Sequence, residues 1–131
     1  MYKIGLLVIG CGNMGTAIID GILKKNIIKN KSLFIVEPNK AQRIFLEGKG
    51  LTIFNDISEV NLYKLKINAV LLAVKPQIAD NVLLDLKNII TDKIFIISII
   101  AGKKISFFKK IFGNKTSVIR VMPNTPACYG K

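Results

Sequence analysis

The chain has 131 residues, the size of a single domain, with 50% hydrophobic residues and a formal net charge of +12. This composition excludes a disordered chain. The apolar runs are well short of the roughly 20 residues that a membrane-spanning helix needs. Because the sequence has no signal-peptide pattern, we expect a cytoplasmic protein. The lysines are scattered along the chain and form no nucleic-acid-binding motif. The chain has two cysteines and no histidine, which suggests neither disulfides nor a metal site. We therefore expect no nucleic acid, membrane or metal partner.

Strand-like and helix-like segments alternate along the chain. Continuous apolar runs predict buried strands, and amphipathic segments that end in glycine or follow a break predict helices. The expected strands cover residues 3–9, 32–38, 51–55, 68–74, 93–100 and 116–122. The expected helices cover residues 15–25, 39–50, 78–90 and 103–113, and residues 57–65 form a helix or a loop. The alternation predicts an α/β fold, a Rossmann-type doubly wound parallel sheet in three layers, with residues 3–9 at its centre.

A glycine turn follows the first predicted strand and opens the first predicted helix. Gly10, Gly12 and Gly15 have the spacing GxGxxG of dinucleotide-binding proteins. Gly10 permits a tight turn, Gly12 has no Cβ to obstruct a pyrophosphate, and Gly15 lets the helix pack close to its strand. The N–H groups of that helix would then face the phosphates. The alternative is that these glycines only shape the turn.

An acidic residue, Glu37, ends the second predicted strand, where it could accept hydrogen bonds from an adenosine ribose. A carboxylate there would repel a 2′-phosphate, so the NAD(P)H cofactor that we expect is preferably NADH. Asn39, Lys40 and Arg43 follow closely and could hold that phosphate if the loop turned Glu37 aside. A third possibility is that Glu37 is a solvated loop carboxylate.

Four stretches, in order along nearly the whole chain, resemble the pyrroline-5-carboxylate reductases, the enzymes of the last step of proline biosynthesis. They are GCGNMGTAIIDG (10–21), LLAVKPQ (71–77), SIIAG (98–102) and VIRVMPNTPA (118–127). Many dehydrogenases share the glycine turn, whereas VKP and RVMPNTP are more specific to this family. Read without the resemblance, Lys75 is an ordinary surface lysine, Pro76 starts a helix and PNTP is a rigid turn.

The resemblance also implies which residues meet the cofactor, and most of them follow the carboxyl end of a strand, where open α/β sheets bind ligands. They are Cys11, Asn13 and Met14 along the pyrophosphate; Glu37, Pro38 and Asn39 at the adenosine ribose; Asn55 near the adenine; Ala73, Val74, Lys75 and Pro76 toward the nicotinamide ribose; and Ala101 and Asn124 near the nicotinamide. No titratable residue is an obvious acid or base, so we assign no catalytic residue.

The implied activity is that of an oxidoreductase, which transfers hydride from NAD(P)H to the C=N carbon of 1-pyrroline-5-carboxylate and forms L-proline. Family members continue with a helical domain that forms the homo-oligomer and most of the substrate pocket. We therefore expect residues 1–131 to be the NAD(P)-binding domain alone, inactive by itself and monomeric or weakly associated. The alternatives are a nucleotide-binding fragment without activity and a reductase related to the 3-hydroxyacid dehydrogenases.

Overall fold

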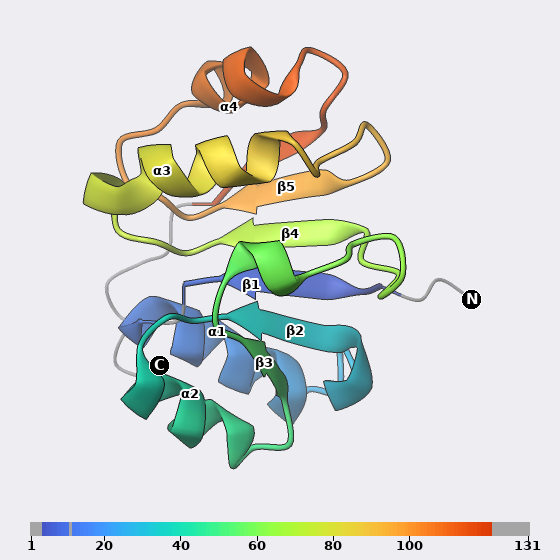
Figure 1. Ribbon diagram of the computed structural model, residues 1–131, viewed down its shortest axis with the longest axis vertical. Coiled ribbons are helices and arrows are strands. Elements are labelled where there is room, and N and C mark those ends of the chain that lie inside the picture. Colours follow the sequence, from blue (N-terminus) through green and yellow to red (C-terminus); the bar gives the residue numbers. More distant parts are fainter. Residues whose placement is uncertain (1–3, 11, 122–131) are drawn as a thin grey trace.

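The computed structural model describes residues 4–10 and 12–121, and these form a twisted parallel sheet flanked by helices (Figure 1). Within this part of the chain the sheet has six strands in the order β3-β2-β1-β4-β5-β6. The strands are β1 (Leu6–Ile9), β2 (Leu33–Val36), β3 (Thr52–Phe54), β4 (Ala69–Leu72), β5 (Phe95–Ser98) and β6 (Val118–Arg120). β1 pairs with both β2 and β4, so the predicted central position of the first strand is confirmed. This order is that of the Rossmann fold, as the alternation predicts.

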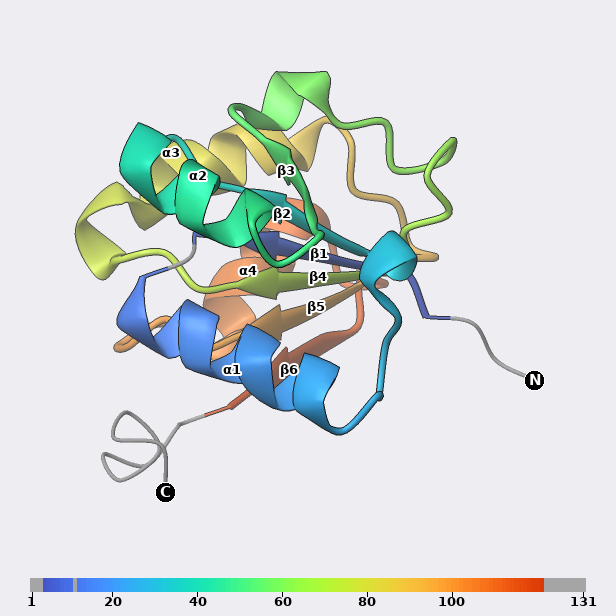
Figure 2. The same ribbon diagram turned by 90° about the horizontal axis from the view of Figure 1, so that it is seen from below.

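Helices cover both faces of the sheet and complete the three predicted layers. The helices are α1 (Asn13–Lys24), α2 (Lys40–Glu47), α3 (Pro76–Lys87) and α4 (Ile105–Phe112), with short 3-10 turns η1 (Asn30–Ser32) and η2 (Ile57–Glu59). Neighbouring residues of β1 point to opposite faces: Val8 packs in one core with Ile19 of α1, and Leu7 packs in the other with Leu83 of α3. α1 and α3 accordingly lie on opposite sides of the strands (Figure 2).

Element ends depart from the sequence prediction in two ways. Strands are shorter than predicted because apolar side chains stay buried beyond the last ladder pair, as with Ile100, which is 1% exposed two residues after β5. The segment 57–65 forms only the short η2 turn, which begins at an Asp56–Glu59 capping box, followed by turns. The last residue of the predicted strand 116–122 lies outside the described residues.

None of the helices formed by residues 4–10 and 12–121 is both long and apolar enough to cross a membrane.

Candidate dinucleotide-binding site

A cleft of about 870 Å³ lies at the carboxyl ends of the central strands. Ile9 and Val36 are the last residues of β1 and β2, Ala73 directly follows β4, and all three line the cleft. Because β1 lies between β2 and β4, the chain leaves the sheet here in opposite directions, which makes this point the switch point of the topology. The size is within the range of roughly 300–1,000 Å³ that small-molecule and cofactor sites occupy.

The fold brings most of the sequence-predicted residues together in this cleft. Those that line it are Gly10, Gly12, Glu37, Pro38, Asn39, Asn55, Ala73, Val74 and Lys75. They come from four separate loops, which follow β1, β2, β3 and β4, and only the parallel pairing of these strands places them side by side.

The remaining predicted residues do not line the cleft or cannot be placed. Met14 and Gly15 lie within α1, Pro76 is the first residue of α3, and Ala101 is exposed in the turn after β5. Cys11 and Asn124 lie outside the described residues, as does the side chain of Asn13.

Gly10 and Gly12 have different reasons to be glycine. Gly10 has φ of +82°, its N–H donates to the Val36 carbonyl at 3.0 Å, and an added Cβ would lie 2.7 Å from Val74 Cγ1. Gly10 is therefore required by the turn itself. Gly12 has φ of −79°, which any residue adopts, and apart from its chain neighbours no residue that the structure describes would lie within 4 Å of an added Cβ. The missing side chain of Gly12 thus leaves open space in front of the first turn of α1.

The N-terminus of α1 adjoins this open space and has no side-chain cap. Gly12 is its N-cap residue and, as a glycine, makes no side-chain cap hydrogen bond to the N–H groups of the first turn. Unpaired N–H groups and the helix dipole both favour a negative group at such an end. The combination suits a phosphate of a dinucleotide.

The opposite wall of the cleft is formed by the loop after β2, and its polar groups are engaged. Glu37 is 8% exposed, its Oε2 accepts from the Asn39 N–H at 2.9 Å, and its own N–H donates to the Phe54 carbonyl at 2.9 Å. This burial excludes the alternative that Glu37 is a solvated carboxylate. Asn39 Oδ1 in turn caps α2 by accepting from the Gln42 N–H at 3.0 Å.

The cationic side chains near the cleft differ in their exposure and in their hydrogen bonds to the protein. Lys75 is exposed at the N-cap position of α3, and Lys40 is exposed at the start of α2. Arg43 is half-buried, and its Nη1 donates to the carbonyls of Glu37 and Pro38 and to Asn55 Oδ1. Of the residues that could hold a 2′-phosphate, Asn39 and Arg43 are thus already hydrogen-bonded within the protein.

Helical residues that no sequence motif marks also line the cleft. Phe45 comes from α2, one turn after Ala41, and Ile78, Val82 and Asp85 come from one face of α3. The sequence signal that could have identified them is their spacing of three or four residues, which places them on a single helical face. Hydropathy alone assigns the apolar ones, Phe45, Ile78 and Val82, to a core.

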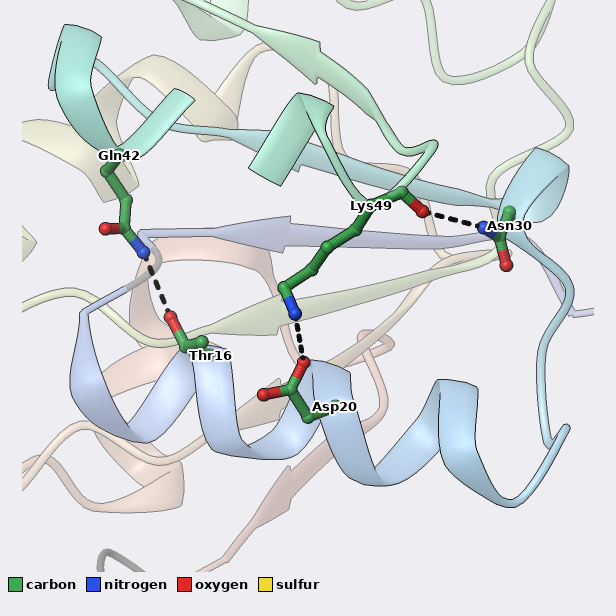
Figure 3. Close-up of polar contacts among 5 residues, drawn as sticks. All are labelled: Thr16, Asp20, Asn30, Gln42 and Lys49. Atoms are coloured by element: carbon green, nitrogen blue, oxygen red, sulfur yellow. Dashed lines mark hydrogen bonds and ion pairs between the residues drawn. The ribbon is translucent and has the colours of Figure 1, made fainter. Parts of the chain in front are cut away.

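Polar contacts join α1 to α2 and so set the two walls relative to each other (Figure 3). Gln42 Nε2 donates to Thr16 Oγ1 at 3.0 Å, and Lys49 Nζ lies 3.2 Å from Asp20 Oδ1. Asn30 Nδ2 donates to the Lys49 carbonyl at 3.0 Å, which ties the turn after α2 to η1, the turn that precedes β2. The helix behind the glycine turn and the helix behind the Glu37 loop are therefore directly linked.

Comparisons with known proteins agree with this architecture. The family model described as "NADP oxidoreductase coenzyme F420-dependent" matches residues 3–102. Pyrroline-5-carboxylate reductase 2 of Bacillus subtilis (strain 168) is 34% identical over 131 residues, which are 100% of this chain and 46% of the relative.

Solved structures show the same similarity. The pyrroline carboxylate reductase of Plasmodium falciparum, solved with NADP bound, has a TM-score of 0.77 at 32% identity over 100% of this chain and 46% of that one. The pyrroline-5-carboxylate reductase of Coxiella burnetii has a TM-score of 0.87 at 27% identity over 98% of this chain and 47% of that one. The chain thus spans slightly less than half the length of each of these proteins. It belongs to the family described as "NADP oxidoreductase coenzyme F420-dependent", and it is similar over its whole length to slightly less than half of several pyrroline-5-carboxylate reductases.

Proposed function

We propose that this chain is the cofactor-binding part of a pyrroline-5-carboxylate reductase, which forms L-proline from 1-pyrroline-5-carboxylate. The observation that carries the proposal is the cleft at the carboxyl ends of β1, β2 and β4, where open space at Gly12 adjoins the uncapped N-terminus of α1. The similarity to pyrroline-5-carboxylate reductases supports the choice of reaction.

The residues of the cleft divide into three parts along an extended dinucleotide. The first turn of α1 and the space at Gly12 would receive the pyrophosphate, because N–H groups can donate there without a side chain in the way. Glu37 and Asn55 would meet the adenosine, and Ala73 to Lys75 would line the path to the nicotinamide ribose. When bound, NAD(P)H supplies the hydride, and the protein holds its ring in place and excludes water.

The substrate pocket is proposed to lie mainly outside these residues. We propose that residues 1–131 form the NAD(P)-binding domain, and that a helical domain supplies the binding of the substrate ring and carboxylate and the subunit interface. Correct placement of the reacting groups supplies on the order of 7–11 kcal/mol of barrier lowering. The isolated chain is then a cofactor binder with little or no turnover, monomeric or weakly associated, and its cytoplasmic location stays a prediction.

The test combines cofactor binding with reconstruction of the enzyme. Titration of the 131-residue chain, followed by nicotinamide fluorescence, is expected to show saturable binding of NADH and NADPH. Fusion to the carboxy-terminal half of the Bacillus subtilis relative is expected to form proline, whereas the chain alone is not. The same fusion carrying Gly12→Ala is the matched control and is expected to lose cofactor affinity.

Two results would contradict the proposal. The first is a folded chain that binds neither cofactor. The second is a fusion that turns over a 3-hydroxyacid but not 1-pyrroline-5-carboxylate. That result would support the alternative of a reductase related to the 3-hydroxyacid dehydrogenases, despite the VKP and MPNTP motifs.

A further inference from the structure

We infer that Arg43 is a positioning residue for the adenosine end of the cofactor site, because it holds the loops after β2 and β3 together. The expected effect on ligand affinity rests on the proposed function, namely cofactor binding. The link between the two loops rests on the hydrogen bonds of the guanidinium. Arg43 itself does not line the cleft, but the three residues that it contacts do.

One nitrogen of Arg43 serves acceptors from two different strands. Nη1 lies 3.1 Å from the Glu37 carbonyl oxygen, 2.6 Å from that of Pro38 and 2.8 Å from Asn55 Oδ1. The first two acceptors follow β2 and the third follows β3, so the guanidinium links the carboxyl ends of neighbouring strands. Hydrogen bonds from a charged donor are stronger than those between neutral groups.

The link stands where the ladder between the strands cannot continue. The last backbone hydrogen bond at this end runs from the Glu37 N–H to the Phe54 carbonyl at 2.9 Å. The next backbone donors, the N–H groups of Asn39 and Asp56, donate instead to Glu37 Oε2 and Glu59 Oε1, each at 2.9 Å, so they do not extend the ladder. Arg43 supplies donors in place of the ladder, from the first turns of α2.

The contact with Asn55 also determines which group its side chain offers to the cleft. The Asn55 N–H is already engaged by Glu59 Oε1 at 2.9 Å, and its Oδ1 is engaged by Arg43. The amide NH₂ group is then the end of the side chain left for a ligand, and it can only donate. Arg43 therefore orients Asn55 as a donor toward an acceptor atom of the adenosine.

This role differs from that of a phosphate ligand in a measurable way. A residue that binds a 2′-phosphate matters only for NADPH, whereas a residue that holds the loops matters for any ligand with an adenosine. NADH, NADPH and ADP-ribose should therefore lose affinity together when the guanidinium is removed.

The experiment compares Arg43→Met with Lys40→Met, which removes the same charge from an exposed position on the same helix. Affinities for NADH, NADPH and ADP-ribose are measured by calorimetry, and amide hydrogen exchange is followed at Glu37, Asn39 and Asn55 without ligand. Arg43→Met is expected to weaken all three ligands by a similar factor, about tenfold, and to speed exchange at those amides. Lys40→Met is expected to leave the NADH affinity and the exchange unchanged, and Arg43→Lys to recover part of the loss.

The outcomes separate this inference from the proposed function. A loss confined to NADPH, or unchanged affinities with unchanged exchange, would overturn the positioning role. If the unmodified chain binds none of the three ligands, the proposed function fails, and the exchange measurement still decides whether Arg43 holds the loops. If Arg43→Met does not fold, Arg43→Lys gives the same comparison with a retained charge.

Discussion

The two ends of the cleft differ in how their polar groups are satisfied before any ligand arrives. At the glycine turn, α1 begins without a side-chain cap and faces open space at Gly12. At the wall after β2, the side chains of Glu37, Asn39 and Arg43 are all hydrogen-bonded to backbone groups. The glycine turn leaves backbone N–H donors for a ligand, whereas the side chains of the wall are already held in place by hydrogen bonds within the protein. Changes at the turn should therefore affect ligand fit or backbone strain, and changes at the wall should affect ligand preference and helix stability.

The largest expected effect comes from Gly10→Ala. A positive φ costs a residue with a side chain about 1–2 kcal/mol, and the close approach of the new Cβ to Val74 adds about 1–3 kcal/mol. Urea unfolding is expected to show a total loss of about 2–5 kcal/mol. Gly102→Ala is the matched control, because Gly102 has φ of +79° but, within residues 4–10 and 12–121, nothing beyond its chain neighbours lies within 4 Å of an added Cβ. Equal losses in the two variants would mean that the Val74 contact is unimportant.

The next effect separates affinity from stability at the same turn. Gly12→Ala places a methyl group in the open space without strain, so it is expected to reduce NADH affinity by at least about tenfold, or about 1.4 kcal/mol. Its unfolding free energy should change by less than about 1 kcal/mol, because the entropic gain of Gly→Ala in the unfolded chain is offset by the poor N-cap preference of alanine. Gly21→Ala, in the same helix and likewise without a contact within 4 Å among the described residues, should leave the affinity unchanged. If Gly12→Ala binds NADH as tightly as the unmodified chain, the proposed placement of the pyrophosphate in this space is wrong.

A third change tests the preference set by the wall. Glu37→Ser removes a carboxylate that would repel a 2′-phosphate and frees the Asn39 N–H, so the ratio of NADPH to NADH affinity is expected to rise about tenfold. Fluorescence titrations with both cofactors measure the ratio. Asp85→Asn removes another carboxylate of the cleft, on α3, and should change the ratio little. Tighter binding of NADPH than of NADH by the unmodified chain would show that the predicted preference for NADH is wrong.

The smallest effect concerns the cap of α2. Asn39→Ala removes the acceptor for the Gln42 N–H, and urea unfolding is expected to show a loss of about 1 kcal/mol. Asn39→Asp keeps an acceptor at the same position and should retain most of the stability. A similar loss in both variants would indicate that the cap is not the cause.

Local signals in the sequence were sufficient for the strand, glycine turn and helix at the start of the fold. A buried apolar run predicts β1, and the φ of +82° at Gly10 is the turn that the GxGxxG spacing predicts. Strand ends were less predictable, because Ile100 and Val74 stay buried after their strands have ended. The cofactor roles of the cleft residues, including Glu37, remain predictions.

The sequence by itself determined the element types and their alternation, because strand and helix periodicity and the conformational freedom of Gly10 depend on neighbouring residues. The tertiary structure decided which side chains meet. Arg43 and Asn55 are 12 positions apart, and their hydrogen bond exists only because β2 pairs with β3. Phe45 and Ile78 likewise share a cleft only because their helices begin after strands on either side of β1. Hydrogen bonds and cleft walls depend on distances across the sheet, and those distances are set by strand order rather than by any local pattern.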